Sequence, residues 1–194
     1  MLFDAAKDAE PEDLQTVHSM LMALKRKGRI NKLHKGEYGY LNYSKKYIYM
    51  KKVTKLDDNI FNDNSKSVSI GIINSKLITL VKDLNPNIAQ NMIAGTDIIF
   101  WKNRIKHIQK HIPDFDSPEQ FKQCFENIPS IISNPDFIST NPKDSSISFI
   151  KKHSKNTSIA VRISNDGKAS FRTMYPLRDS QLNNYIENGR AKVV

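Results

Sequence analysis

The last third of the chain is dominated by alternating apolar and polar residues. The segments 146–153, 156–164 and 168–175 each show this period of two, which predicts β-strands with one buried face. The sequence Asn-Asp-Gly at 165–167 separates the last two segments and is typical of a hairpin turn. The pattern therefore predicts an antiparallel meander, which a helix over 178–188 closes.

Between residues 67 and 138 the hydrophobic period changes repeatedly. Short apolar runs predict strands at 68–73, at 97–101 and after Asn134-Pro135. Apolar residues three or four positions apart predict helices at 74–84 and 85–95, around 105–112, and after Asp116 or Ser117. Helices followed by antiparallel strands predict an α+β domain.

The N-terminal quarter has a different pattern. An apolar stripe at helical spacing runs from Leu14 to Leu24, after the start signal Pro11-Glu12-Asp13, and Gly28 ends the helix. The next residues, up to Tyr43, read as a two-stranded hairpin around a glycine turn. A polar segment rich in Asp, Asn and Ser follows. We therefore expect a small module at 1–56, a linker at 57–66 and the α+β domain at 67–194.

The N-terminal pattern, LQTVHSMLMALKRKGRINKLHKGEYGYLNY (14–43), resembles the last part of a winged helix-turn-helix domain, without that family's first helix. The resemblance implies a small winged-helix-like N-terminal domain whose helix enters the major groove and whose wing contacts phosphate. The residues that would contact nucleic acid are Gln15, Thr16, Ser19, Lys25, Arg26, Arg29, Lys32 and Lys35. Protein contact or dimerisation is the alternative use of such a module.

Charge and composition favour a protein that binds a polyanion and exclude one held together by disulfides. The net charge is +10, and residues 14–56 hold eleven Lys and Arg against one acid, which favours a polyanionic partner, first of all nucleic acid. A single cysteine, Cys124, excludes a disulfide framework, and its spacing beside Phe121 and Phe125 predicts a small core residue. We find neither a signal peptide nor an apolar run long enough to span a membrane, and expect a cytoplasmic protein with no membrane contact.

Two histidines, His107 and His111, lie four residues apart beside an apolar stripe. On a helix they would share one face, and three uses are open: a metal clamp, acid/base work, or plain surface histidines. The zinc motif HExxH requires Glu where Ile108 stands, and no third ligand has a suitable spacing, so we expect no metal and no cofactor. Acid/base work suits histidine, whose ordinary pKa is closest to neutral.

The later strands add cations and hydroxyl groups to these histidines. They carry Lys151, Lys152, Arg162, Arg172, Thr173 and Tyr175. On the strand over 171–175, alternation places 171, 173 and 175 on one face and 172 and 174 on the other. Histidines beside such groups have the chemistry for metal-free RNA cleavage: a base activates the 2′-OH, cations stabilise the phosphorane, and an acid protonates the leaving oxygen. A solvated strand face is the plain alternative for each residue taken singly.

Residues 68–194 resemble the phage-associated branch of the barnase–EndoU–colicin–RelE (BECR) nuclease superfamily. The resemblance rests on IKHIQKH (105–111), IPSIISNPDFI (128–138), SISFIKK (146–152), AVRI (160–163) and FRTMY (171–175). It implies a helical N-terminal part and a four-stranded antiparallel sheet, and a metal-independent ribonuclease that often serves as a toxin. Carried over, His107 or His111 is the acid/base, Arg172, Thr173 and Tyr175 contact the phosphate and transition state, and Lys151 or Lys152 is a further cation.

We therefore predict a metal-independent endoribonuclease that leaves a 2′,3′-cyclic phosphate and acts as a toxin of a toxin–antitoxin or phage-linked conflict system. Its expected partners are an RNA substrate, DNA through the N-terminal module, and an antitoxin or immunity protein. The alternative is a DNA-binding transcriptional regulator whose nuclease-like domain is inactive. Of the two histidines we expect His111 to face the strand of Arg172, because it is nearer the helix C-terminus, where the dipole favours the protonated form.

Overall fold

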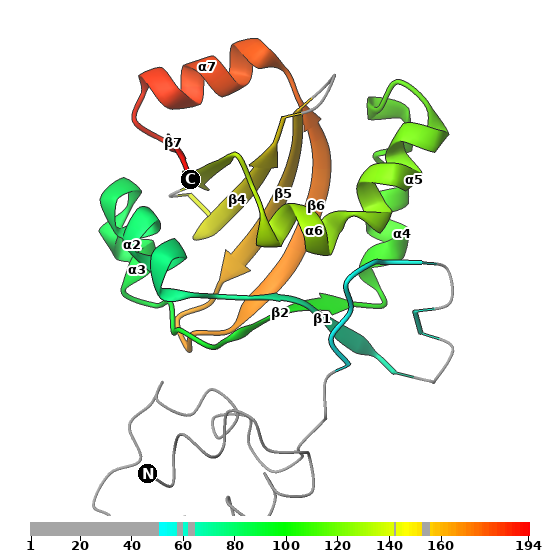
Figure 1. Ribbon diagram of the computed structural model, residues 1–194, viewed down its shortest axis with the longest axis horizontal. Helices are drawn as coiled ribbons and strands as arrows, with labels where there is room; N and C mark the ends of the chain where they lie inside the picture. Colours follow the sequence, from blue (N-terminus) through cyan, green and yellow to red (C-terminus); the bar gives the residue numbers. More distant parts are fainter. Residues whose placement is uncertain (1–50, 58–59, 62–64, 142, 153–155) are drawn as a thin grey trace, which may run out of the picture. The chain divides into compact units, whose positions relative to one another are not determined.

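The fold is built on one mixed sheet with the strand order β1-β2-β6-β5-β4-β3-β7 (Figure 1). A computed structural model describes residues 51–194 apart from 58–59, 62–64, 142 and 153–155. The strands are β1 (Ser67–Ile72), β2 (Asp97–Trp101), β3 (Phe137–Asn141), β4 (Ser146–Lys151), β5 (Asn156–Ile163), β6 (Ala169–Leu177) and β7 (Ala191–Val193). All neighbouring strands are antiparallel except β2 and β6, which run parallel.

Helices lie on both faces of the sheet. They are α2 (Ser75–Leu84), α3 (Pro86–Ala89), α4 (Arg104–Gln109), α5 (Pro118–Glu126), α6 (Ile128–Ser133) and α7 (Asp179–Glu187), with a 3-10 helix, η1, at Ile112–Asp114. The helices that precede β3 contribute to the large hydrophobic core on one face, which we call the α5 face. Within the described residues no helix is both long enough and apolar enough to cross a membrane.

The large core lies between the α5 face and these helices. Phe100 of β2 and Phe171 of β6 meet at its centre, with ring centroids 4.9 Å apart, and Phe125 of α5 packs on Phe100. The opposite face, which we call the α7 face, holds a second and smaller cluster. It is formed by Phe137, Ile150, Leu177 and Leu182, and Tyr175 and Tyr185 pack against it. Figure 1 shows α7 at the end of the strands away from β1 and β2.

Local sequence signals account for most of the elements. Asn74 caps α2, because its side chain accepts a hydrogen bond from the backbone of Leu77 at 2.8 Å. Ser117 caps α5 in the same way, and a proline follows it in the first turn. Gly167 has a φ of +82°, the left-handed conformation that the predicted β5–β6 turn requires. The strands and helices predicted at these places are confirmed, with their ends displaced by a few residues.

The four-stranded antiparallel sheet that we expected is wrong in number, because the sheet has seven strands. The four expected strands, β3 to β6, form its centre. β1 and β2 extend it through the parallel pairing of Ile98 with Ala169, and β7 extends it at the other edge beside β3. Neither extension follows from local periodicity, because pairing between distant strands depends on long-range contacts and β7 has only three residues.

The core includes residues from the segment that we expected to be a linker, 57–66, and the residue just before it. Leu56, Ile60 and Phe61 are buried, and the Leu56 backbone donates a hydrogen bond to Glu126 at 3.0 Å. The Phe61 ring stacks on Phe100 at 6.2 Å between centroids. Through these apolar residues, Leu56, Ile60 and Phe61 belong to the core of the α+β domain, whose packing begins before residue 67. The expected winged-helix-like module lies outside the described residues, apart from 51–56.

Candidate active site at the α4 edge of the sheet

Two histidines meet at the end of α4, but not on one continuous helix. α4 ends at Gln109, and Pro113, four residues further on, has no N–H group to donate to the Gln109 carbonyl and continue the α-helix. His111 therefore precedes the 3-10 helix η1 instead of extending α4. The chain still brings the two rings together: the centroids of His107 and His111 are 5.7 Å apart, edge to face.

The two histidines have different surroundings. The Nδ1 atom of His111 donates a hydrogen bond to Asp114 Oδ2 at 2.8 Å, which orients the ring and leaves Nε2 available. The pKa of His107 lies below its ordinary value of 6.5, first because its ring loses some contact with water and then because of nearby positive charge. These surroundings favour the neutral form of His107, whereas a carboxylate orients His111.

Arg172 of β6 is one source of the charge that acts on His107, together with Arg104, Lys110 and the neighbouring histidine. α4 packs against β6, which brings these residues together although 65 positions separate them in the chain. The sequence predicted that one histidine would face the strand of Arg172, and favoured His111. The electrostatic influence of Arg172 on His107 points to His107 instead.

A β-bulge sets the position of Arg172. Val161 of β5 pairs with Phe171, and Ala160 pairs with Thr173, so Arg172 has no partner on β5. The extra residue reverses the alternation that the sequence predicted. Phe171 faces the large core, whereas Thr173 lies opposite Ala160 on the α7 face. The expectation that residues 171, 173 and 175 share one face is wrong for this reason.

The cations around His107 carry uncompensated charge. No hydrogen bond or ion pair within the described part of the chain engages the side chains of Arg104, Lys106, Lys110 or Arg172. These residues and His107 form the α4 cationic cluster. Cations at an exposed edge that lack acidic partners favour an anionic ligand such as a phosphodiester.

The other expected catalytic residues lie elsewhere. Tyr175 packs against the small cluster beside Tyr185 of α7, and the Thr173 hydroxyl is buried without a hydrogen-bond partner among the described residues. Lys151 is held by Asp136 Oδ1 at 2.8 Å and by the Asn134 carbonyl at 2.9 Å. The structure therefore brings together His107, His111 and Arg172, and places Thr173, Tyr175 and Lys151 away from them.

The remaining expected contacts are dispersed. The Lys152 ammonium lies over the Phe137 ring, 5.3 Å from its centroid, and Arg162 is exposed on β5 opposite Ser146. Cys124 packs against the large core and its thiol lies 3.2 Å from Thr157 Oγ1, in agreement with a core role; burial raises the pKa of the thiol. Outside the described residues lie Gln15, Thr16, Ser19, Lys25, Arg26, Arg29, Lys32 and Lys35.

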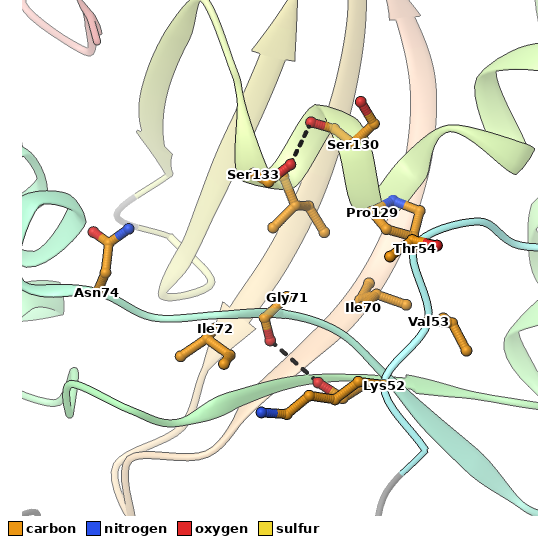
Figure 2. Close-up of a pocket in the computed structure, with 12 residues that line it drawn as sticks. Lys52, Val53, Thr54, Ile70, Gly71, Ile72, Asn74, Pro129, Ser130 and Ser133 are labelled. Atoms are coloured by element: carbon orange, nitrogen blue, oxygen red, sulfur yellow. Dashed lines mark hydrogen bonds between the residues drawn. The ribbon is translucent and has the colours of Figure 1, made fainter. Parts of the chain in front are cut away.

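A cleft of about 580 Å³ lies at another place, beside β1 (Figure 2). The segment Lys52–Thr54, the β1 residues around Gly71 and the helix α6 line it. A Cβ atom at Gly71 would lie 2.6 Å from Ile132 Cγ2, so glycine allows β1 and α6 to approach closely. Lys52 is the one ionisable residue among those that line the cleft, which therefore lacks an acid/base pair. Among the residues described, no group of three or more His, Cys, Asp or Glu could hold a metal ion.

Comparison with known proteins identifies a family whose matched range includes the α4 edge of the sheet. Residues 79–184, more than half of the chain, match the model of the family described as phage-Barnase-EndoU-ColicinE5/D-RelE like nuclease 3. No curated protein and no solved structure matches the chain. The matched range contains α4, η1 and β3 to β6, and thus both histidines and Arg172.

Proposed function

The chain belongs to the phage-Barnase-EndoU-ColicinE5/D-RelE like nuclease 3 family, and on that premise we propose that it is a metal-independent endoribonuclease whose reacting groups are His107, His111 and Arg172. The family implies a nucleic-acid substrate and phosphodiester cleavage. The resemblance to the nuclease superfamily in the sequence is thereby confirmed, whereas the match does not reach the winged-helix-like segment.

The proposal rests on the meeting of two histidines with an arginine across the α4–β6 contact. The lowered pKa of His107 favours its neutral form, which can accept the proton of a ribose 2′-OH. The 2′-oxygen then attacks phosphorus and the bond to the 5′-oxygen breaks. His111, which Asp114 orients, donates a proton to that leaving oxygen. The products are a 2′,3′-cyclic phosphate and a 5′-hydroxyl.

Arg172 supplies the positive charge that this reaction needs. A guanidinium group can donate two parallel hydrogen bonds to a phosphate, and it stabilises the charge that develops on the pentacoordinate phosphorane. Arg172 lies in a bulge, between two residues with other roles. Phe171 faces the large core, and Thr173 lies on the opposite face of the sheet. A pair of histidines in unlike environments supports separate roles as base and acid.

The biological role that we propose is that of a toxin in a toxin–antitoxin or phage-linked conflict system. The phage-derived family description supports this setting. A cytoplasmic ribonuclease would need an inhibitory antitoxin or immunity protein, and the basic N-terminal segment would hold RNA or DNA through its lysines and arginines. The domain organisation proposed for the chain is this basic module followed by the nuclease domain.

The purified full-length chain, incubated with RNA, tests the proposed chemistry. We expect RNA fragments with 2′,3′-cyclic phosphate and 5′-hydroxyl ends, formed equally well in the presence of EDTA. A 2′-deoxy nucleotide at a mapped cleavage site should abolish cleavage there, because the attacking oxygen is missing. Cleavage of that substituted strand, or products with 3′-hydroxyl ends, would contradict the proposal.

A further inference from the structure

One exposed aromatic side chain stands next to the proposed active site and has no role in the chemistry above. Trp101, the last residue of β2, is 40% exposed, and it is the one tryptophan of the chain. The other exposed large hydrophobic side chains of the described residues are aliphatic. Leaving a tryptophan ring in water is unfavourable compared with burying it, so a ligand that covers the ring would gain binding energy.

Trp101 ends the strand that pairs with the strand of Arg172. In the parallel contact of β2 with β6, Ile98 pairs with Ala169 and Ile99 with Ser170, and the rings of Phe100 and Phe171 meet. Trp101 lies two residues beyond the last of these pairs on β2, and Arg172 lies two residues beyond it on β6. Both residues therefore follow the paired segment on the same side, and the charge of Arg172 acts on His107.

The chain on the other side of Trp101 is strongly basic. A two-residue turn at Lys102–Asn103 connects it to α4, which carries the α4 cationic cluster, and α4 packs against β2 as well as β6 (Figure 1). An exposed indole ring next to unpaired cations is the combination that binds single-stranded nucleic acid. The ring stacks on a base, and the cations hold the phosphates on either side.

We propose that Trp101 is the base-stacking subsite of the enzyme and restricts it to unpaired nucleotides. This inference rests on the proposed function, because it assigns the substrate class of the same site. A base within a duplex is stacked on both of its faces and cannot cover the indole ring, whereas an unpaired base can. Stacking on Trp101 would hold the strand while Arg172 contacts the phosphate that His107 and His111 act on.

Because Trp101 is the one tryptophan of the chain, tryptophan fluorescence reports directly on binding at this residue. A fluorescein-labelled 2′-deoxy oligonucleotide, which lacks the attacking hydroxyl, measures affinity by anisotropy, and the unlabelled strand reports stacking by quenching tryptophan fluorescence. We expect saturable quenching by the single strand and much weaker quenching by a hairpin stem of the same composition. Trp101→Ala and Trp101→Leu should both bind the labelled strand about 5- to 100-fold more weakly, and Trp101→Phe should retain most of the affinity.

Ile72→Ala is the matched control, because Ile72 is equally exposed at 41% but lies at the other end of β1 from the pairing with Trp101. It should bind the strand like the parent chain. Oligonucleotide binding without quenching, or Trp101→Ala with unchanged affinity, would overturn the stacking role. If the strand quenches Trp101 and Trp101→Ala loses affinity, but the parent chain cleaves no RNA, the stacking role stands and the nuclease mechanism is refuted. If paired and unpaired RNA are cleaved at equal rates, the stacking role alone is refuted.

Discussion

The α4 edge and the α7 face use neighbouring residues of β6 in opposite ways. At the α4 edge, Arg172 lies near His107 and near lysine and arginine side chains that have no acidic partner in the described part of the chain. On the α7 face, Thr173 lies against the sheet with its hydroxyl buried, and Tyr175 packs beside Tyr185. A single bulge residue separates the two environments.

The comparison shows that residue type alone does not identify a catalytic group. Arginine, threonine and tyrosine on one strand all suit phosphate chemistry, but Arg172 is the one of the three whose charge acts on a histidine. The α7 face has the composition of a packed layer. Its Tyr185 has a raised pKa, first because of burial and then because of Tyr175, and an arginine that stacks on its ring opposes that shift.

The largest effect that we expect is from His107→Ala at the α4 edge. Loss of a general base lowers the rate by about 10²–10⁴-fold, and kcat for RNA cleavage should fall by that order. His107 is exposed, so the melting temperature should stay close to that of the parent chain. A variant that unfolds at the usual temperature and cleaves RNA at the parent rate would remove His107 from the mechanism.

Arg172→Met keeps a long side chain but removes its charge. It should lower kcat by about 10²-fold, because one group that stabilises the transition state is lost. It should also raise the pKa of His107, because Arg172 is one of the charges that lower it. The base must be neutral to accept a proton, so the acidic limb of the pH–rate profile should move to higher pH.

Arg172→Lys serves as the control for this second change, because lysine keeps the positive charge but not the two-pronged hydrogen bonding. It should leave the acidic limb near its original pH while kcat remains low. If the acidic limb of the pH–rate profile keeps its original pH in Arg172→Met as well, Arg172 does not act on His107 as proposed.

The smallest effect should come from the α7 face. Thr173→Val replaces a buried hydroxyl that has no partner among the described residues with a methyl group of similar size. Removing an unsatisfied buried polar group costs little or stabilises the fold, by about 1 kcal/mol. Cleavage should stay within a few-fold of the parent rate. A loss as large as that of His107→Ala would show that the α7 face, and not the α4 edge, carries the chemistry.

Local sequence patterns are enough to predict most of the strands and helices and the residue types of the site. Period and capping residues located most strands and helices, as at Asn74 and Ser117, and the glycine at 167 located the β5–β6 turn. These features depend on neighbours within a few residues of one another. The two histidines could be singled out for the same reason, since their spacing is local.

Which of these groups come near one another depends on the fold. The parallel pairing of β2 with β6 and the bulge at Arg172 depend on contacts between residues far apart in the chain, and neither can be predicted from a period-two pattern. That pairing joins the strand of Trp101, which the sequence pattern shows simply as an apolar strand, to the strand of Arg172. The pairing of β2 with β6 and the packing of α4 on both strands, rather than the composition of any segment, bring the elements that carry Trp101, Arg172 and His107 together.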